Sequence, residues 1–149
     1  MRDRDVRNAM RDAMLATGMF DNVTLAGLPE DYASAAGSLA LAVIEPFSVR
    51  QEDFWDSTAI EGLKITSVVE ITFLARNEDP QLRDEKVEQM MNAAINVIQG
   101  QNLAEITVPE HTRFTSAKWL KPKAPERRII TTFTYEYLQI GWGSYDTAE

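Results

Sequence analysis

Cysteine is absent from the 149-residue chain and histidine occurs once, so thiolate chemistry is excluded and imidazole chemistry has a single candidate. Without cysteine there can be no disulfide and no thiolate metal site. The one histidine, His111, stands beside Glu110 in VPEHTRF, which is neither a catalytic triad nor a metal site. No GxGxxG or GxxxxGK(S/T) pattern occurs, and the seven glycines are scattered. We therefore expect no enzyme activity, no metal and no cofactor.

Long apolar runs are also absent. None approaches the roughly 20 residues that a membrane-spanning helix needs. The first residues, MRDRDVRNAMRDAM, are charged throughout and lack the apolar centre of a signal peptide. The sequence thus predicts a soluble, unprocessed chain with no membrane partner.

An excess of basic residues is the third absence. With 15 basic and 23 acidic residues the net charge is −8, which argues against a protein that grips nucleic-acid phosphates. It is compatible with DNA that only passes an acidic wall, although solubility is the commoner reason for such a charge. One basic cluster stands out, with Trp119 among its members. It indicates either a small nucleic-acid patch or a positive hairpin tip that docks on an acidic neighbouring copy; its residues are Lys118, Lys121, Lys123, Arg127 and Arg128.

What the sequence does contain is two helical and four strand-like patterns. Apolar residues at spacings of three and four predict helices over 3–17 and about 80–99. Asp79 fits the N-cap of the second helix, and Pro80 fits its first position. Alternation or short apolar runs bounded by breakers predict strands over 39–44, 63–75, 113–120 and 128–140. Pro46 should end the first strand or lie on a sheet edge, and 50–62 is then a long linker.

These elements predict an α+β domain with the order α-β-β-α-β-β. We expect a four-stranded, mostly antiparallel sheet, covered on one side by the long helix and the N-terminal helix. The single domain spans 1–140, and 141–149 is a C-terminal tail. The inner face of the last strand, with Phe133, Tyr135 and Tyr137, should pack on the long helix through Met91, Ile95 and Ile98.

The last strand is apolar on both faces toward its C-terminal end, which a sheet with one wet face does not require. We interpret its outer residues as a contact with a neighbouring chain. The aromatic pair in the linker either folds back onto the sheet or contacts a partner. The candidate interface residues are Phe54, Trp55, Leu138, Ile140, Trp142 and Tyr145.

The order and texture of these segments resemble the tail terminator, or tail completion, proteins of long-tailed bacteriophages and related neck proteins. The resemblance is carried by RDVRNAMRDAM, SLALAVIEP, ITSVVEITFLA, DPQLRDEKVEQMMNAAINVIQG and RRIITTFTYEYL. It implies a structural virion protein that forms a hexameric ring, caps the tail tube and offers a docking face to the head–neck connector. The implied partners are other copies of the chain, the tail tube protein and the connector or stopper protein. The implied location is the tail or neck of the virion, and the host cytoplasm during assembly.

In such a ring DNA is passing cargo, not a specific ligand. We expect the inner wall to be net negative or neutral, because six copies of an acidic chain cannot place all their carboxylates outside. The candidate lumen-facing residues, chosen for their expected exposure, are Glu52, Asp53, Asp56 and Glu61.

Two other function classes stay open. One is a small ferredoxin-like ligand-binding or regulatory module, which would be a monomer or dimer with a concave apolar pocket. The other is a small hydrolase on a similar sheet. That enzyme would need a glycine-rich loop and a paired arginine to hold an anion, and the sequence shows neither.

Overall fold

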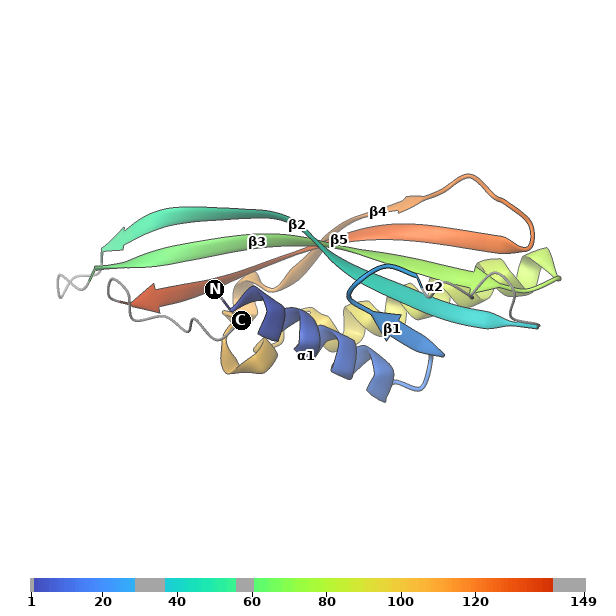
Figure 1. Ribbon diagram of the computed structural model, residues 1–149, viewed down its shortest axis with the longest axis horizontal. Coiled ribbons are helices and arrows are strands. Elements are labelled where there is room, and N and C mark those ends of the chain that lie inside the picture. Colours follow the sequence, from blue (N-terminus) through green and yellow to red (C-terminus); the bar gives the residue numbers. More distant parts are fainter. Residues whose placement is uncertain (1, 29–36, 56–60, 141–149) are drawn as a thin grey trace.

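Two helices and one long twisted sheet make up the protein (Figure 1). The computed structural model describes residues 2–28, 37–55 and 61–140. In the sheet the strands lie in the order β1-β2-β3-β5-β4; β1 is parallel to β2 and every other neighbouring pair is antiparallel. The elements are α1 (Asp3–Ala16), β1 (Asn22–Thr24), β2 (Leu39–Trp55), β3 (Glu61–Arg76), α2 (Pro80–Ile98), the 3-10 turns η2 (Leu103–Glu105) and η3 (Pro109–His111), β4 (Arg113–Trp119) and β5 (Glu126–Ile140).

The α+β class is confirmed, but the prediction of four strands in the order α-β-β-α-β-β is wrong. The additional strand, β1, was not predicted because it has only three residues, too few to show a period of two. It forms because Val23 is buried and because its backbone pairs with residues 41–43 of β2.

For Pro46 the sequence left two outcomes open: the end of the first strand is wrong, and the position on a sheet edge is confirmed. β2 continues to Trp55, so most of the expected 50–62 linker is strand, and only 56–60 lies outside the described residues. Pro46 is tolerated because β1 pairs only as far as Val43, so Pro46 lies on an open edge where no neighbour needs its missing N–H. A register shift between Pro46 and Ser48 leaves Phe47 as the extra residue of a bulge.

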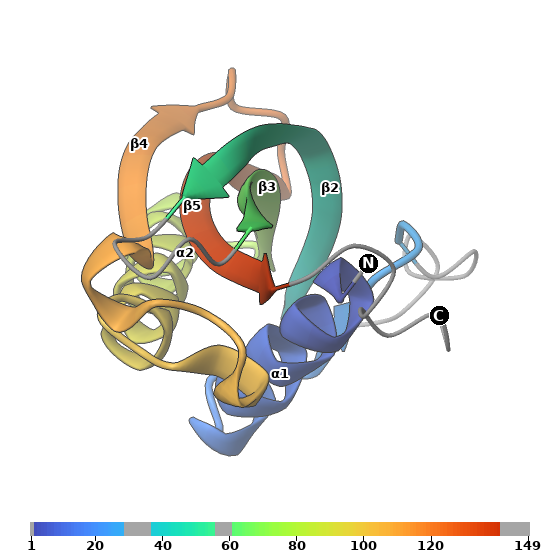
Figure 2. The ribbon, with the colours of Figure 1, turned by 90° about the vertical axis from the view of Figure 1, so that its left-hand side faces the viewer.

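Both helices lie against the same face of the sheet, as the view along the long axis shows (Figure 2). α1 contributes three fully buried side chains, and α2 four. Fully burying a large aliphatic side chain contributes about 1.5–3 kcal/mol, so this interface makes a large contribution to stability. The fully buried helix residues are Val6, Met10, Met14, Val87, Met90, Ala94 and Ile98.

The core face of the sheet follows the predicted alternation. Ile65, Val69, Ile71 and Phe73 of β3 are 1% exposed or less. Phe133, Tyr135 and Tyr137, the inner residues predicted on β5, are also fully buried. Ile98 of α2 is fully buried as well. Met91 and Ile95 are half-buried and pack against the same cluster.

Local signals in the sequence explain where α2 begins. The Asp79 carboxylate accepts hydrogen bonds from the backbone N–H groups of Gln81 at 2.9 Å and Leu82 at 3.4 Å, and Pro80 occupies the first turn. After the helix, Gly100 adopts φ +74°, which favours glycine. The start predicted from the sequence is confirmed.

Candidate functional site

The structure gathers most of the predicted interface and lumen residues at one end of the sheet, where β2 and β5 end and β3 begins, beyond the helices (Figure 1). We call this the hairpin end: residues 51–55 of β2, 61–65 of β3 and 137–140 of β5. The backbone register places Phe54, Gly62 and Ile140 in one row across three strands, and Glu52, Lys64 and Leu138 in another. Asp56, Trp142 and Tyr145 lie outside the described residues, while Asp53, Trp55 and Glu61 take part in the strand ladder here.

Leu138 is the predicted interface residue whose side chain is seen to be exposed. It is 41% exposed on the helix-free face of β5, directly opposite Lys64. A large aliphatic side chain in that position has no core to enter. It therefore fits a contact with another molecule.

Of the predicted lumen residues, Glu52 is the one whose side chain the structure describes. Its carboxylate lies 3.6 Å from Arg50 Nε and 3.9 Å from Lys64 Nζ. Lys64 Nζ also lies 3.4 Å from Glu136 Oε1, and His111 Nδ1 lies 3.6 Å from Glu136 Oε2. The charge of this surface is thus mixed, and Arg50 and Lys64 offset part of its acid.

Sequence reasoning missed an exposed apolar stretch on β2. Phe47 is 65% exposed and Val49 is 43% exposed. Both come after Val43, the last residue of β2 that pairs with β1. The alternation of FSVRQ was a usable signal, but Pro46 led to the strand being ended too early. Along this part of β2 the outer edge has no strand partner in the described part of the chain, and the proline and the bulge make it less open to indiscriminate pairing.

The basic cluster predicted from the sequence lies around the turn between β4 and β5. Arg127 is held in place, because its guanidinium lies 4.7 Å from the centre of the Trp119 ring and 3.5 Å from Asp84 of α2. Arg128 pairs with Glu126 at 3.1 Å. The lysines of the cluster, by contrast, are exposed.

A buried carboxylate is the largest surprise. Asp3 in the first turn of α1 is 6% exposed and accepts hydrogen bonds from the hydroxyl groups of Ser67, Tyr135 and Tyr137. Burial, together with the hydrogen bond to Asp3 and its negative charge, raises the pKa of the Tyr135 phenol well above its usual value near 10. An aspartate in the first turn of a helix is explained by the helix dipole alone, and nothing in the sequence around Asp3 indicates three partners more than 60 residues away.

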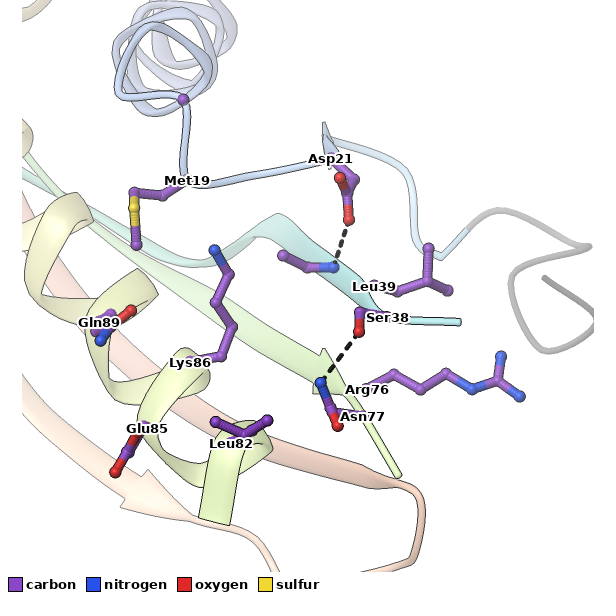
Figure 3. Close-up of a pocket in the computed structure, with 12 residues that line it drawn as sticks. Met19, Asp21, Ser38, Leu39, Arg76, Asn77, Leu82, Glu85, Lys86 and Gln89 are labelled. Atoms are coloured by element: carbon purple, nitrogen blue, oxygen red, sulfur yellow. Dashed lines mark hydrogen bonds between the residues drawn. The ribbon is translucent and has the colours of Figure 1, made fainter. Parts of the chain in front are cut away.

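A pocket of about 420 Å³ lies between the start of α2, the turn after α1, and the adjoining ends of β2 and β3 (Figure 3). Lys86 extends into it from α2. Asp21 accepts a hydrogen bond from the backbone N–H of Ala40 at 2.8 Å, and Asn77 donates to the Ser38 hydroxyl at 3.0 Å. Much of the lining of this pocket is polar or charged. It therefore differs from the concave apolar pocket that a ligand-binding module was expected to have.

Within residues 2–28, 37–55 and 61–140, no three His, Cys, Asp or Glu side chains gather in a way that could hold a metal ion. In the same residues no helix is long and apolar enough to cross a membrane.

Comparison with known proteins finds likeness among solved structures but not among family models or curated sequences. No family model and no curated protein sequence matches the chain. Among solved structures, the fold is similar to that of a chain in the virion of a native gene transfer agent particle. The two chains are 21% identical, the TM-score is 0.53, and the match covers 93% of each. The likeness is therefore one of fold over nearly the whole length of both chains.

Proposed function

We propose that this protein is a structural component of a phage-like virion. The observation that carries the proposal is the fold shared, end to end, with a chain of a gene transfer agent virion. The sequence resemblance to phage neck proteins is independent support.

Within the virion, the role we propose is that of a tail terminator. Six copies form a ring that caps the tail tube, stops its growth and joins it to the head–neck connector. DNA crosses the lumen without being bound specifically, and no step of the role requires catalysis. The candidate lumen residues are Glu52, Asp53 and Glu61 of the hairpin end, together with Asp56, which lies outside the described residues.

The surface of the chain supports a role in assembly. Phe47, Val49 and Leu138 are exposed on strands, and in the described part of the chain no strand pairs with the outer edge of β2 at Phe47 and Val49. Burying an exposed Phe, Val or Leu contributes roughly 1.5–3 kcal/mol, so a few such contacts begin to offset the cost of association. A protein that works alone has little use for this combination.

The proposal is tested by the mass and shape of the purified protein. Light scattering after size exclusion, with and without the tail tube protein, should give six times the 16.8 kDa chain mass in at least one condition. Negative-stain images of that fraction should average to a six-fold ring with a central opening. A monomer or dimer in both conditions, with no ring in the images, would rule out the terminator role.

The second candidate, a small ligand-binding module, has one observation in its favour, the pocket beside Lys86. Such a module predicts a monomer or dimer whose melting temperature rises when a small ligand binds. Screening thermal shifts against small anionic and neutral metabolites, with Lys86→Ala as the control, separates the two functions. Ring formation without any ligand-dependent shift favours the virion role.

A further inference from the structure

Charge is unevenly divided along the chain. Residues 113–128, which include β4 and the turn into β5, hold six of the 15 basic residues and one acidic residue. This segment therefore carries a net charge of +5, which leaves −13 on the rest of the chain. A separation of this size creates a positive surface on a strongly negative molecule.

The positive surface is centred on the turn between β4 and β5, and we call it the lysine tip: Lys118, Lys121 and Lys123. All three side chains are exposed, and none forms an ion pair with another described residue. Lys121 and Lys123 line a shallow pocket of about 230 Å³ with Leu120, Glu126 and Arg128. Trp119, beside the tip, is 39% exposed. The tip thus combines lysines that have no described ion-pair partner with a hollow and with an exposed tryptophan that is next to Lys118 in the sequence.

A complementary surface lies on β2. Glu45 is directly opposite Glu70 on β3, and neither carboxylate forms an ion pair with any residue the structure describes. Like charges placed opposite each other across two strands repel and destabilise the sheet. Phe47, two residues from Glu45, is 65% exposed. We call Glu45, Glu70 and Phe47 the glutamate pair surface; it combines two carboxylates that have no described ion-pair partner with an exposed aromatic residue of the same strand.

We propose that the lysine tip of one copy docks on the glutamate pair surface of a second copy of this chain. The ammonium groups neutralise two carboxylates that repel each other in the isolated chain, and Phe47 and Trp119 supply the apolar centre of the contact. Interfaces commonly have this anatomy, with an aromatic anchor inside a polar rim.

Charge complementarity selects another copy over nucleic acid as the occupant. A phosphate backbone that reached the tip would also approach a body of charge −13, which repels it. The same acidic body attracts the lysine tip of another copy. If the tip bound nucleic acid, the repulsion between Glu45 and Glu70 would still have no positive group to offset it.

The two surfaces differ, so each copy can offer its tip to one neighbour and its glutamate pair to the next. Such head-to-tail contacts repeat from copy to copy and close into a ring when the rotation between copies allows it. Only the closure of these contacts into a ring rests on the proposed function. The contact itself stands on the described side chains.

The test uses two charge-reversed proteins and their mixture. Lys121→Glu with Lys123→Glu makes both surfaces negative, and Glu45→Lys with Glu70→Lys makes both positive. Each variant alone should lose at least about tenfold in self-association at low salt, because the contact now joins like charges. Mixed in equal amounts, the two should associate again, since each tip then meets a surface of opposite charge. Sedimentation velocity of each protein and of the mixture measures this.

Two further variants guard against misfolding as the explanation. Glu85→Lys with Glu88→Lys makes the same change of charge on the exposed face of α2 and should leave association unchanged. Glu45→Gln removes the repulsion with Glu70, so the monomer should melt at a higher temperature while its association weakens. A purely structural role for Glu45 would not move these two readouts in opposite directions.

The outcomes separate this inference from the ring. Rings that form equally well from wild-type and charge-reversed proteins overturn the docking contact and leave the terminator role standing. Charge-dependent pairs that never give a six-fold ring support the contact and count against the terminator role. A wild-type protein that is monomeric at low salt, a mixture that fails to associate, or duplex DNA binding that is lost with the tip lysines while self-association is unchanged would each overturn the inference.

Discussion

The Tyr135 hydroxyl donates a 2.5 Å hydrogen bond to the carboxylate of Asp3, a residue 132 positions earlier in the chain. The Tyr137 hydroxyl donates to the other oxygen at 2.9 Å, and Ser67 donates to the first. This one carboxylate therefore ties the first turn of α1 to both β3 and β5. Three hydroxyl donors offset much of the cost of burying it, because hydrogen bonds to a charged group are stronger than neutral ones.

Replacing Asp3 should show what this cluster contributes. Asp3→Ala leaves three hydroxyl groups without their acceptor in a buried site, which costs about 1–3 kcal/mol of unfolding free energy. Asp5→Ala is the matched control, because Asp5 is exposed in the same helical turn and should change stability by less than about 0.5 kcal/mol. Urea denaturation of both variants measures the difference. Equal effects would mean that Asp3 acts only through the helix dipole.

The raised pKa of Tyr135 predicts how stability changes at high pH. In the folded protein the phenol keeps its proton to a higher pH than in the unfolded chain, where it ionises near pH 10. The stabilisation from this group is complete below about pH 10 and is lost as the pH rises further, at up to about 1.4 kcal/mol per pH unit. Tyr135→Phe should be less stable at neutral pH and should lose stability less steeply above pH 10. Parallel curves for the two proteins would contradict the prediction.

How much the sequence could predict depends on the range of the interaction. Asp79 and Pro80 define the start of α2 within four residues of chain, and the alternation of β3 identifies its core face without further information. Signals of this kind act between near neighbours, so they are visible in the sequence alone.

Contacts between distant residues were not predictable in the same way. Asp3 has the local pattern of a solvated helix start, and its partners become evident only once β3 and β5 lie beside each other. Pro46 is a breaker by every local rule, yet the open edge of β2 lets the strand run on past it. Similarly, the repulsion of Glu45 and Glu70 exists only because the register places them opposite each other.

His111 is expected to be dispensable. Its imidazole lies 3.6 Å from Glu136, but its side chain is 46% exposed and Glu136 keeps Lys64 as a second partner at 3.4 Å. A partly exposed contact of this kind contributes about 1 kcal/mol at most. His111→Ala should therefore fold, form rings and support virion assembly like the wild type. Failed assembly by a folded variant would point to a chemical role for this residue.

The C-terminal tail gives a prediction from the sequence that lies outside the described residues. Trp142 and Tyr145 are large aromatic residues directly after β5, and in a ring they are expected to contact the next copy. Deleting residues 141–149 should leave a folded protein that no longer assembles at low concentration. The rival expectation, that the tail folds back on its own chain, predicts a lower melting temperature instead, and an unchanged oligomer would exclude the tail from the interface.

Leu138 offers the sharpest single-residue test of the interface at the hairpin end. The side chain is 41% exposed on β5, and Leu15 on α1 is 40% exposed, so the two leucines are matched in residue type and exposure. Leu138→Gln removes apolar surface that we propose another copy buries, which should weaken each subunit contact by roughly 1.5–3 kcal/mol. Stability of the monomer should change by less than about 0.5 kcal/mol, because the side chain has few contacts of its own to lose. Leu15→Gln should affect neither quantity. Sedimentation velocity and urea denaturation of both variants decide the matter: equal assembly by the two proteins would show that the helix-free face of β5 is not buried in the ring.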